Sequence, residues 1–322
     1  ADGKSIENVK IRVNQKSHEF KFGANLFMLD ELEKQRYKRH FLLPGWDESE
    51  QEKLKNTTVF VAGAGGTGSP TITMLALLGV GTIKICDFDV FEVSNQNRQF
   101  LHAFSEDRLG MNKAKSAAKT VKMLNPNVEV VYYDEKFTEE NIDMMVGNSD
   151  FIFDCVDKFK YKFILADCAQ RLNIPMFFYG IMNYNTFGYI FHPPKTACFH
   201  CIFDESKVEY IERANLRAGD VAATSTALFT AAGIMASQAL KYLVNKEEIP
   251  FNKMLLHFNK QKNAFNDKGV RAFRYWHTDY FYNESLKQGF DWNCNGDTDL
   301  FHTLYIEHNP DCPYCSKLHK NK

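Results

Sequence analysis

The sequence lacks an excess of charge of either sign. It contains 39 basic and 40 acidic side chains among its 322 residues, so its formal net charge is −1. Such a balance produces no long-range attraction to nucleic acid or to an anionic membrane. We therefore expect neither as a partner, and any site that binds an anion must be built locally.

Long apolar runs are also missing. The N-terminus begins Ala-Asp-Gly-Lys-Ser, without an apolar signal core, and the most apolar stretch, Thr226–Val244, is interrupted by Ser237, Gln238 and Lys241. A membrane-spanning helix requires about 20 consecutive apolar residues. The composition, 44% hydrophobic and 25% charged, is typical of a globular protein and argues against disorder. The sequence predicts a folded protein with no membrane partner.

Cysteine is absent from residues 202–293, and four of the eight cysteines form two Cys-x-x-Cys pairs. These pairs, Cys198/Cys201 and Cys312/Cys315, favour a metal site in a reducing compartment, so we expect a cytoplasmic protein. Four thiolates make a closed tetrahedral Zn²⁺ site with a structural role. A site joining pairs so far apart would tie the C-terminal tail to the main domain. A redox pair and a chance arrangement are the alternatives, and His200, inside the first pair, is expected to be exposed rather than a ligand.

A strand, a glycine loop and a helix follow one another in the first half of the chain. Residues 57–62 are β-branched and apolar, residues 63–68 read Gly-Ala-Gly-Gly-Thr-Gly, and residues 69–78 have a helical pattern. Glycine permits the tight turn and close backbone approach that phosphate binding at a helix N-terminus requires. A second strand, Thr82–Cys86, ends at Asp87, about 20 residues past the glycines, where a carboxylate can accept hydrogen bonds from ribose. A nucleotide is implied, and its identity stays open.

Two further strand and helix units continue this alternation. A helix over residues 113–124 precedes a strand over 128–132, and a helix over 139–146 precedes a strand over 150–153 that leads to Asp157. Strands that alternate with helices form a parallel sheet, and ligands bind beyond the carboxyl ends of its strands. The predicted fold is therefore α/β, a Rossmann-like doubly wound and mostly parallel sheet. Gly63–Gly68, Asp87 and Asp157 should meet at one edge of it.

Two cations accompany the glycine loop. Residues 94–99 read Ser-Asn-Gln-Asn-Arg-Gln, and Gly110-Met111-Asn112-Lys113 opens the next helix. Triphosphate chemistry needs such fixed cations because charge builds on the departing pyrophosphate. Together with Arg36-Tyr37-Lys38-Arg39 and both cysteine pairs, these motifs resemble the ubiquitin-activating superfamily, in particular its HesA/MoeB/ThiF branch. Members of that branch are adenylyltransferases that activate ubiquitin-like sulfur carriers of molybdopterin and thiamin synthesis.

The resemblance implies roles for individual residues. ATP would be bound by Gly63, Gly65, Gly66, Gly68, Asp87, Asp89, Ser94, Asn95, Arg98, Lys113, Asp157 and Lys158. The residues implied in catalysis are Arg39, donated by the partner of a homodimer, together with Arg98, Lys113 and Asp157, the last positioning Mg²⁺. Relatives often carry asparagine and arginine where this chain has Lys158 and Lys162, so contacts with nucleotide or substrate are expected to differ there.

The implied reaction joins the C-terminal glycine carboxylate of a small ubiquitin-like carrier, ending in Gly-Gly, to the α-phosphate of ATP, with release of pyrophosphate. Some relatives continue to a cysteine thioester, but this chain has no cysteine in residues 202–293, so we expect adenylation alone, with Cys294 as the one remaining candidate nucleophile. Three alternatives stay open: adenylation of a ribosomal peptide C-terminus, an NAD-dependent oxidoreductase, and a catalytically silent zinc-bound scaffold. The oxidoreductase leaves Arg98, Lys113 and the cysteine pairs without a role.

Three segments are expected along the chain. Residues 1–28 would form an N-terminal hairpin segment, residues 29–263 the nucleotide-binding adenylation domain, and residues 264–322 an aromatic-rich insert with the zinc-binding tail. The aromatic side chains of the insert suit either a protein-recognition surface or a packed accessory subdomain.

Overall fold

The computed structural model describes residues 28–43, 45–103, 106–182, 185–193, 198–203, 225–244, 271–277, 301–306 and 312–315. The hairpin expected in residues 1–28 lies outside the described residues except for its last one. The same holds for most of the aromatic-rich insert, including Cys294.

Within the described residues, eight strands form one sheet in the order β3-β2-β1-β4-β5-β6-β7-β8. The strands are β1 (Thr58–Ala62), β2 (Thr82–Cys86), β3 (Glu129–Tyr133), β4 (Phe151–Asp154), β5 (Met176–Met182), β6 (Asn185–Phe191), β7 (Arg271–His277) and β8 (Phe301–Ile306). The pairings from β3 to β5 are parallel, and those from β5 to β8 are antiparallel. The predicted α/β, doubly wound and mostly parallel sheet is confirmed for its first five strands, and antiparallel strands extend it.

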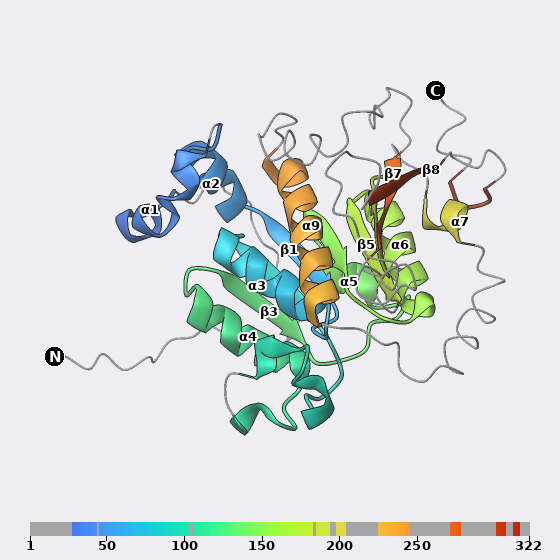
Figure 1. Cartoon of the computed structure of the whole chain (residues 1–322), viewed down its shortest axis with the longest axis horizontal. Coiled ribbons are helices and arrows are strands. Elements are labelled where there is room, and N and C mark those ends of the chain that lie inside the picture. The colour runs from blue at the N-terminus through green and yellow to red at the C-terminus, as the bar shows by residue number, and fades with distance from the viewer. Residues whose placement is uncertain are drawn as a thin grey trace, which may run out of the picture.

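Helices cover both faces of the parallel part (Figure 1). The longer helices are α3 (Gly68–Leu78), α4 (Lys113–Leu124), α6 (Phe159–Leu172) and α9 (Ser225–Val244), and the shorter ones are α1 (Glu31–Tyr37), α2 (Glu48–Lys55), α5 (Ile142–Val146) and α7 (Phe199–Ile202). Helices α3, α4 and α9 share one buried cluster with the sheet, whereas α5, α6 and α7 share the other. Among the described helices, none is long and apolar enough to cross a bilayer.

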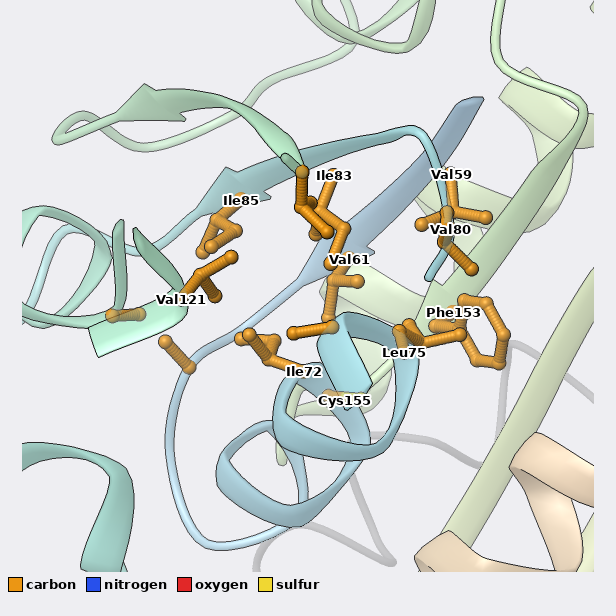
Figure 2. Packing of buried hydrophobic residues seen from close by; sticks show 14 of the residues in the cluster. Val59, Val61, Ile72, Leu75, Val80, Ile83, Ile85, Val121, Phe153 and Cys155 are labelled. Carbon is orange, nitrogen blue, oxygen red and sulfur yellow. The ribbon is translucent and has the colours of Figure 1, made fainter. Parts of the chain in front are cut away.

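The central strands are buried on both faces. In β1, Val59 and Val61 belong to the cluster that contains Ile72 and Leu75 of α3 and Val121 of α4 (Figure 2), whereas Phe60 and Ala62 belong to the cluster under α6. All four side chains have no exposed surface. A strand covered on both sides reads as a continuous apolar run, which explains the uninterrupted pattern of residues 57–62.

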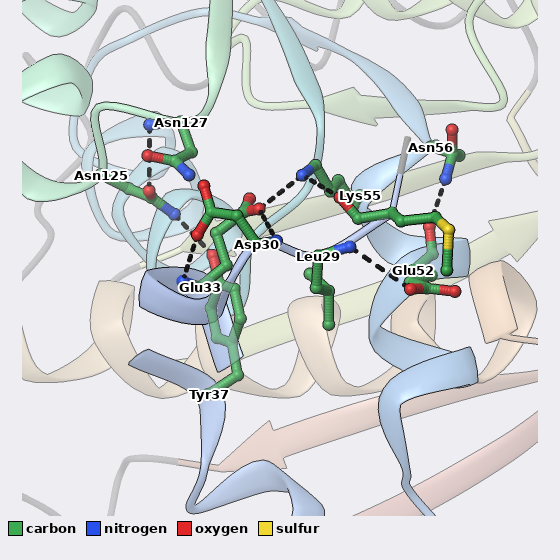
Figure 3. A network of polar contacts seen from close by, with 10 residues as sticks. Leu29, Asp30, Glu33, Tyr37, Glu52, Lys55, Asn56, Asn125 and Asn127 are labelled. Carbon is green, nitrogen blue, oxygen red and sulfur yellow. Dashed lines mark hydrogen bonds and ion pairs between the residues drawn. The ribbon is translucent and has the colours of Figure 1, made fainter. Parts of the chain in front are cut away.

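Helix α1 is fixed near the amino ends of the parallel strands (Figure 3). Asn125, which follows α4 and precedes β3, donates to the Tyr37 hydroxyl at 2.8 Å. Arg36 Nη1 donates to the Leu124 carbonyl at 3.2 Å. The Glu33 carboxylate forms an ion pair with Lys55 of α2. These contacts hold the residues after α1, Arg39 among them, at this amino edge of the sheet.

Candidate functional site

The carboxyl ends of three parallel strands meet at one edge of the sheet. Gly63 N, just after β1, donates to Cys86 O at 2.7 Å, and Cys155 N, just after β4, donates to Ala62 O at 2.8 Å. The glycine loop, Asp87 and the segment that leads to Asp157 therefore start side by side. We call this place the carboxyl edge.

The glycine loop is packed so tightly that two of its positions exclude any side chain. Gly63 has a φ of +94°, and a Cβ atom there would lie 2.7 Å from Cys155 O. A Cβ atom at Gly68 would lie 2.1 Å from Gly63 O. The Thr67 hydroxyl donates to Cys155 O at 3.0 Å and ties the loop to the segment after β4. Since α3 begins at Gly68, the loop presents the N-terminal N–H groups of that helix, which suit an anion.

Asp87 is fixed in orientation beside this loop. Its carboxylate accepts hydrogen bonds from Ala64 N at 2.7 Å and from Asp89 N at 2.8 Å. Burial raises the pKa of Asp87, against the opposing effect of these two hydrogen bonds and of the Lys113 charge. The carboxylate thus keeps a defined position at the end of β2.

Two cations lie at the rim of the loop. Lys113 opens α4, is 7% exposed, and its Nζ lies 3.2 Å from Asp89 Oδ2. Arg98 Nη1 donates to Ser94 O at 2.9 Å, and Arg98 Cδ lies 3.7 Å from where a Cβ atom of Gly66 would be. The structure therefore brings both cations to the carboxyl edge.

The Asn95 side chain is engaged in its own turn. It is buried, its Oδ1 accepts from Glu92 N at 3.2 Å, and its Nδ2 donates to Ser94 Oγ at 3.4 Å. In this arrangement Asn95 shapes the turn that carries Arg98.

The segment after β4 contains one buried ion pair and two exposed charges. Asp154 has no exposed surface, and Lys162 Nζ lies 3.1 and 3.0 Å from its two carboxylate oxygens. Asp157 and Lys158 are exposed. Of the two lysines at which altered ligand contacts were expected, Lys162 is therefore committed to Asp154 in the interior. Lys158 alone faces outward.

Arg39 is not brought to the carboxyl edge of its own chain. It is exposed and follows α1, which is anchored at the amino edge.

The four cysteines of the two pairs converge. Their sulfur atoms all lie within 4.8 Å of one another. The Sγ–Sγ distances are 3.7 Å for Cys198–Cys201, 3.6 Å for Cys198–Cys312 and 3.5 Å for Cys201–Cys315. A Zn²⁺ ion with four thiolates at about 2.3 Å requires sulfur atoms about 3.8 Å apart. The donor set and its spacing therefore fit a tetrahedral zinc ion.

His200 is not exposed, contrary to expectation. Its side chain is 4% exposed, its Nε2 lies 2.7 Å from Asp167 Oδ1, and its ring stacks on Tyr314 with centroids 3.4 Å apart. His200 lies between Cys198 and Cys201, and Tyr314 between Cys312 and Cys315. The stacked pair thus joins the two cysteine segments without belonging to the four-sulfur cluster.

Sequence reasoning missed one residue of the carboxyl edge, His102. Its side chain has no exposed surface, and its Nε2 lies 2.7 Å from Ala64 O in the glycine loop. Burial lowers the pKa of His102 from 6.5 to about 4, aided by the charges of Lys113 and Arg108. The signal was a lone histidine within the apolar run of residues 100–104, a pattern that does not distinguish a loop contact from a buried core residue.

We expect His102 to make the protein less stable as the pH falls from 7 to 5. In this window the unfolded chain binds a proton on His102 that the folded chain excludes, so the free energy of unfolding should decrease by about 2 kcal/mol through this residue. Urea unfolding of wild type and His102→Gln at pH 7 and at pH 5 measures this decrease in the free energy of unfolding. The decrease should be smaller in the variant by that amount, and equal decreases would contradict the expectation.

The fold and the carboxyl edge define a Rossmann-like α/β protein, with a glycine loop and two cations at the edge where ligands of such sheets bind. Within that class, the profile of the ThiF family matches residues 37–274, and the chain belongs to this family. The family resemblance drawn from the motifs is thereby confirmed.

Relatives and solved structures agree with this assignment. The chain is 30% identical over 239 residues to the adenylyltransferase and sulfurtransferase MOCS3 of Drosophila sechellia, covering 74% of this chain and 51% of that protein. It is 29% identical to protein HesA of Leptolyngbya boryana, covering 71% of this chain and 82% of HesA. The chain thus spans about half the length of MOCS3. A crystal structure of E. coli MccB with succinimide superposes with a TM-score of 0.66 at 22% identity, covering 87% of this chain and 73% of MccB, which supports the fold.

Proposed function

We propose that this protein uses ATP to adenylate the C-terminal glycine carboxylate of a small ubiquitin-like carrier. The observation that carries the proposal is the convergence of the glycine loop, Asp87, Arg98 and Lys113 at one edge of the sheet. The names of the relatives support it, since they include adenylyltransferases, an archaeal SAMP-activating enzyme E1 and ubiquitin-like modifier-activating enzymes.

The nucleotide is placed by the backbone of the loop and by Asp87. The N–H groups at the start of α3 bind the phosphates, with Gly63, Gly65, Gly66 and Gly68 allowing the close approach. The Asp87 carboxylate accepts hydrogen bonds from the ribose hydroxyls with lone pairs that Ala64 N and Asp89 N leave available. ATP then lies with its α-phosphate beyond the carboxyl ends of β1 and β4.

The reaction is an in-line displacement at the α-phosphorus. A carboxylate oxygen of the acceptor forms a bond to this phosphorus while the bond to the bridging oxygen of the β-phosphate breaks, and pyrophosphate leaves with the electron pair. The acceptor carboxylate is already ionised at neutral pH, so no general base is required. Arg98 and Lys113 neutralise the charge that grows on the pyrophosphate. Lys113 exchanges its present partner, Asp89, for that charge.

Asp157 fits a role in holding Mg²⁺. Asp154 is committed to Lys162, whereas Asp157 is exposed at the carboxyl edge. Carboxylate and phosphate oxygens are the ligands that Mg²⁺ prefers. When bound, this ion supplies further neutralisation of the phosphate charge.

The position of Arg39 supports a homodimer. The residue is exposed at the amino edge of its own chain, so it serves the reaction only when a second copy presents it to the glycine loop. The proposed assembly therefore has two equivalent sites, each completed by the partner chain.

The four-cysteine cluster has a structural role in this proposal. A zinc ion held by Cys198, Cys201, Cys312 and Cys315 leaves no open coordination position, so it fastens the tail and takes no part in adenylation. Its thiolates join residues 198–201, close to α6, to residues 312–315.

The other described cysteines favour adenylation without a thioester. Cys86, Cys155 and Cys168 are buried. Burial raises the pKa of Cys86 and of Cys155 to about 12, and also raises that of Cys168. A thiol that stays protonated is a poor nucleophile. A separate protein would then take up the activated carrier.

Acceptor-dependent exchange of labelled pyrophosphate into ATP tests the proposal. We expect exchange with carriers that end in Gly-Gly, and a loss of at least about 100-fold in Asp157→Ala, since that carboxylate would hold the Mg²⁺ ion that neutralises the phosphate charge. Asp143→Ala is the control: it removes a carboxylate outside the glycine loop that accepts two hydrogen bonds from Arg171, so it should lower stability without abolishing exchange. Exchange with peptides alone would select peptide adenylation instead, and no exchange with any acceptor would indicate a silent scaffold.

A further inference from the structure

A buried histidine side chain contacts the backbone of the glycine loop. His102 ends a short 3₁₀ turn, Phe100–His102, and its imidazole has no exposed surface. Its Nε2 lies 2.7 Å from Ala64 O. On the other side of the same residue, Ala64 N donates to Asp87 Oδ2 at 2.7 Å. The backbone of Ala64 is therefore clamped between His102 and Asp87.

The protonation state of the imidazole follows from these surroundings. Burial keeps His102 neutral, because its pKa is lowered to about 4. A carbonyl oxygen can only accept, so Nε2 carries the single ring proton and donates it. Within the described part of the chain, the other ring nitrogen, Nδ1, is buried without a hydrogen-bond partner.

If packing were the only role of this side chain, histidine would be less favourable here than phenylalanine. Its ring packs against Phe91, with centroids 5.2 Å apart, which a phenylalanine could do equally well. A phenylalanine would also avoid burying an unsatisfied acceptor such as Nδ1. What the phenylalanine lacks is the donor for Ala64 O. The hydrogen bond to the loop is thus the feature that distinguishes histidine here.

We propose that His102 is a positioning residue for the nucleotide, which fixes the Ala64 peptide so that the loop N–H groups keep their place relative to Asp87. The inference rests on the proposed function, because it takes the loop and Asp87 as the binding groups for phosphate and ribose. His102 acts through Ala64 and does not touch the nucleotide.

The peptide that His102 holds includes the N–H of Gly65, one of the loop N–H groups that would bind the phosphates in the proposed function. Ala64 O and Gly65 N belong to the same planar unit, so rotation of the carbonyl also turns this N–H. Gly65 and Gly66 follow directly, and glycine offers little resistance to such a rotation. Without the histidine donor, the loop would populate other orientations, and the phosphates and ribose would no longer be bound at the correct spacing.

A second buried polar side chain from the same segment also lies behind the loop. Gln99 is 4% exposed, and its Nε2 lies 3.7 Å from where a Cβ atom of Gly65 would be. His102 N donates to Gln99 O at 3.1 Å, which places the two residues on consecutive turns. Residues 99–102 thus pack against the loop, and the His102 side chain makes the hydrogen bond to Ala64 O.

Two substitutions separate the hydrogen bond from the packing. His102→Phe keeps a planar ring but removes the donor, whereas in His102→Gln the side-chain N–H₂ occupies the place of Nε2–H. We expect the dissociation constant for ATP, measured by calorimetry on the whole protein, to rise about 10-fold in His102→Phe and to stay within about 3-fold of wild type in His102→Gln. In the exchange assay the KM for ATP should rise in His102→Phe while the KM for the acceptor stays unchanged.

Phe91→Leu is the matched control for packing around the imidazole. It reduces ring contact with His102 but leaves the donor, so it should lower the melting temperature without changing ATP affinity more than about 2-fold. Unchanged ATP affinity in His102→Phe, or an equal loss in His102→Gln, would overturn the inference. ATP binding by the wild-type protein in the same titrations would leave the proposed function standing. A wild-type protein that binds no ATP would overturn both.

Discussion

Gly68→Ala is expected to reduce the affinity for ATP by at least about 100-fold, because it displaces the loop by roughly an ångström. The added Cβ atom would lie 2.1 Å from Gly63 O, a backbone atom that no rotamer change can move away. Relief requires Gly63 and Gly68 to separate, and this widens the turn that presents the N–H groups to the phosphates. Calorimetric titration with ATP measures the loss.

The chain offers a matched control for this substitution. Gly233 lies in α9, and a Cβ atom there would lie 3.9 Å from its nearest neighbour, Met74 Cε, an ordinary contact. Gly233→Ala should therefore keep ATP affinity and stabilise the helix by up to about 1 kcal/mol. ATP binding by Gly68→Ala equal to that of the Gly233→Ala protein would contradict the role given to the loop.

Cys312→Ser is expected to remove zinc from the protein and to lower its stability by several kcal/mol. With three thiolates left, the site loses its fourth soft ligand and its hold on residues 312–315. Elemental analysis of the purified protein should find close to one zinc per wild-type chain and far less in the variant. Thermal unfolding should show a lower midpoint for the same reason.

Cys168→Ala provides the comparison for this loss. Cys168 is as buried as the cluster and lies on α6, but it is not one of the four converging cysteines. Its substitution should leave zinc content unchanged while costing some packing energy. Zinc retained in Cys312→Ser, or lost equally from Cys168→Ala, would contradict the assignment of the cluster.

Four of the five parallel strands could be predicted because each has a local apolar pattern, whereas β5 and helix α6 were not predicted. Strand β2 and helix α4 have the predicted bounds, Thr82–Cys86 and Lys113–Leu124. The helix expected over 139–146 is shorter, α5 beginning at Ile142. Asn141 Oδ1 instead accepts from Thr138 N, and such side-chain bonds favour a turn over a helix.

Other elements were not predicted, for identifiable reasons. Helix α2 has almost no apolar periodicity, although its capping box, Asp47 with Glu50, was a readable signal. The antiparallel extension depends on pairing β7 with β6 across more than 80 residues, and no local pattern encodes such a contact.

The same limit applies to the candidate site. The sequence supplied Asp87, Arg98 and Lys113 by motif, but the pairing of Lys162 with Asp154 and the contact of His102 with Ala64 depend on packing.

The most direct test of carrier adenylation by this protein is the intact mass of a carrier ending in Gly-Gly after incubation with this protein, ATP and Mg²⁺, followed by an acid quench. We expect a carrier heavier by one AMP less a water, with pyrophosphate formed in equal amount and no adduct with Asp157→Ala. An unmodified carrier in every reaction, under conditions in which the protein binds both ATP and that carrier, would contradict it.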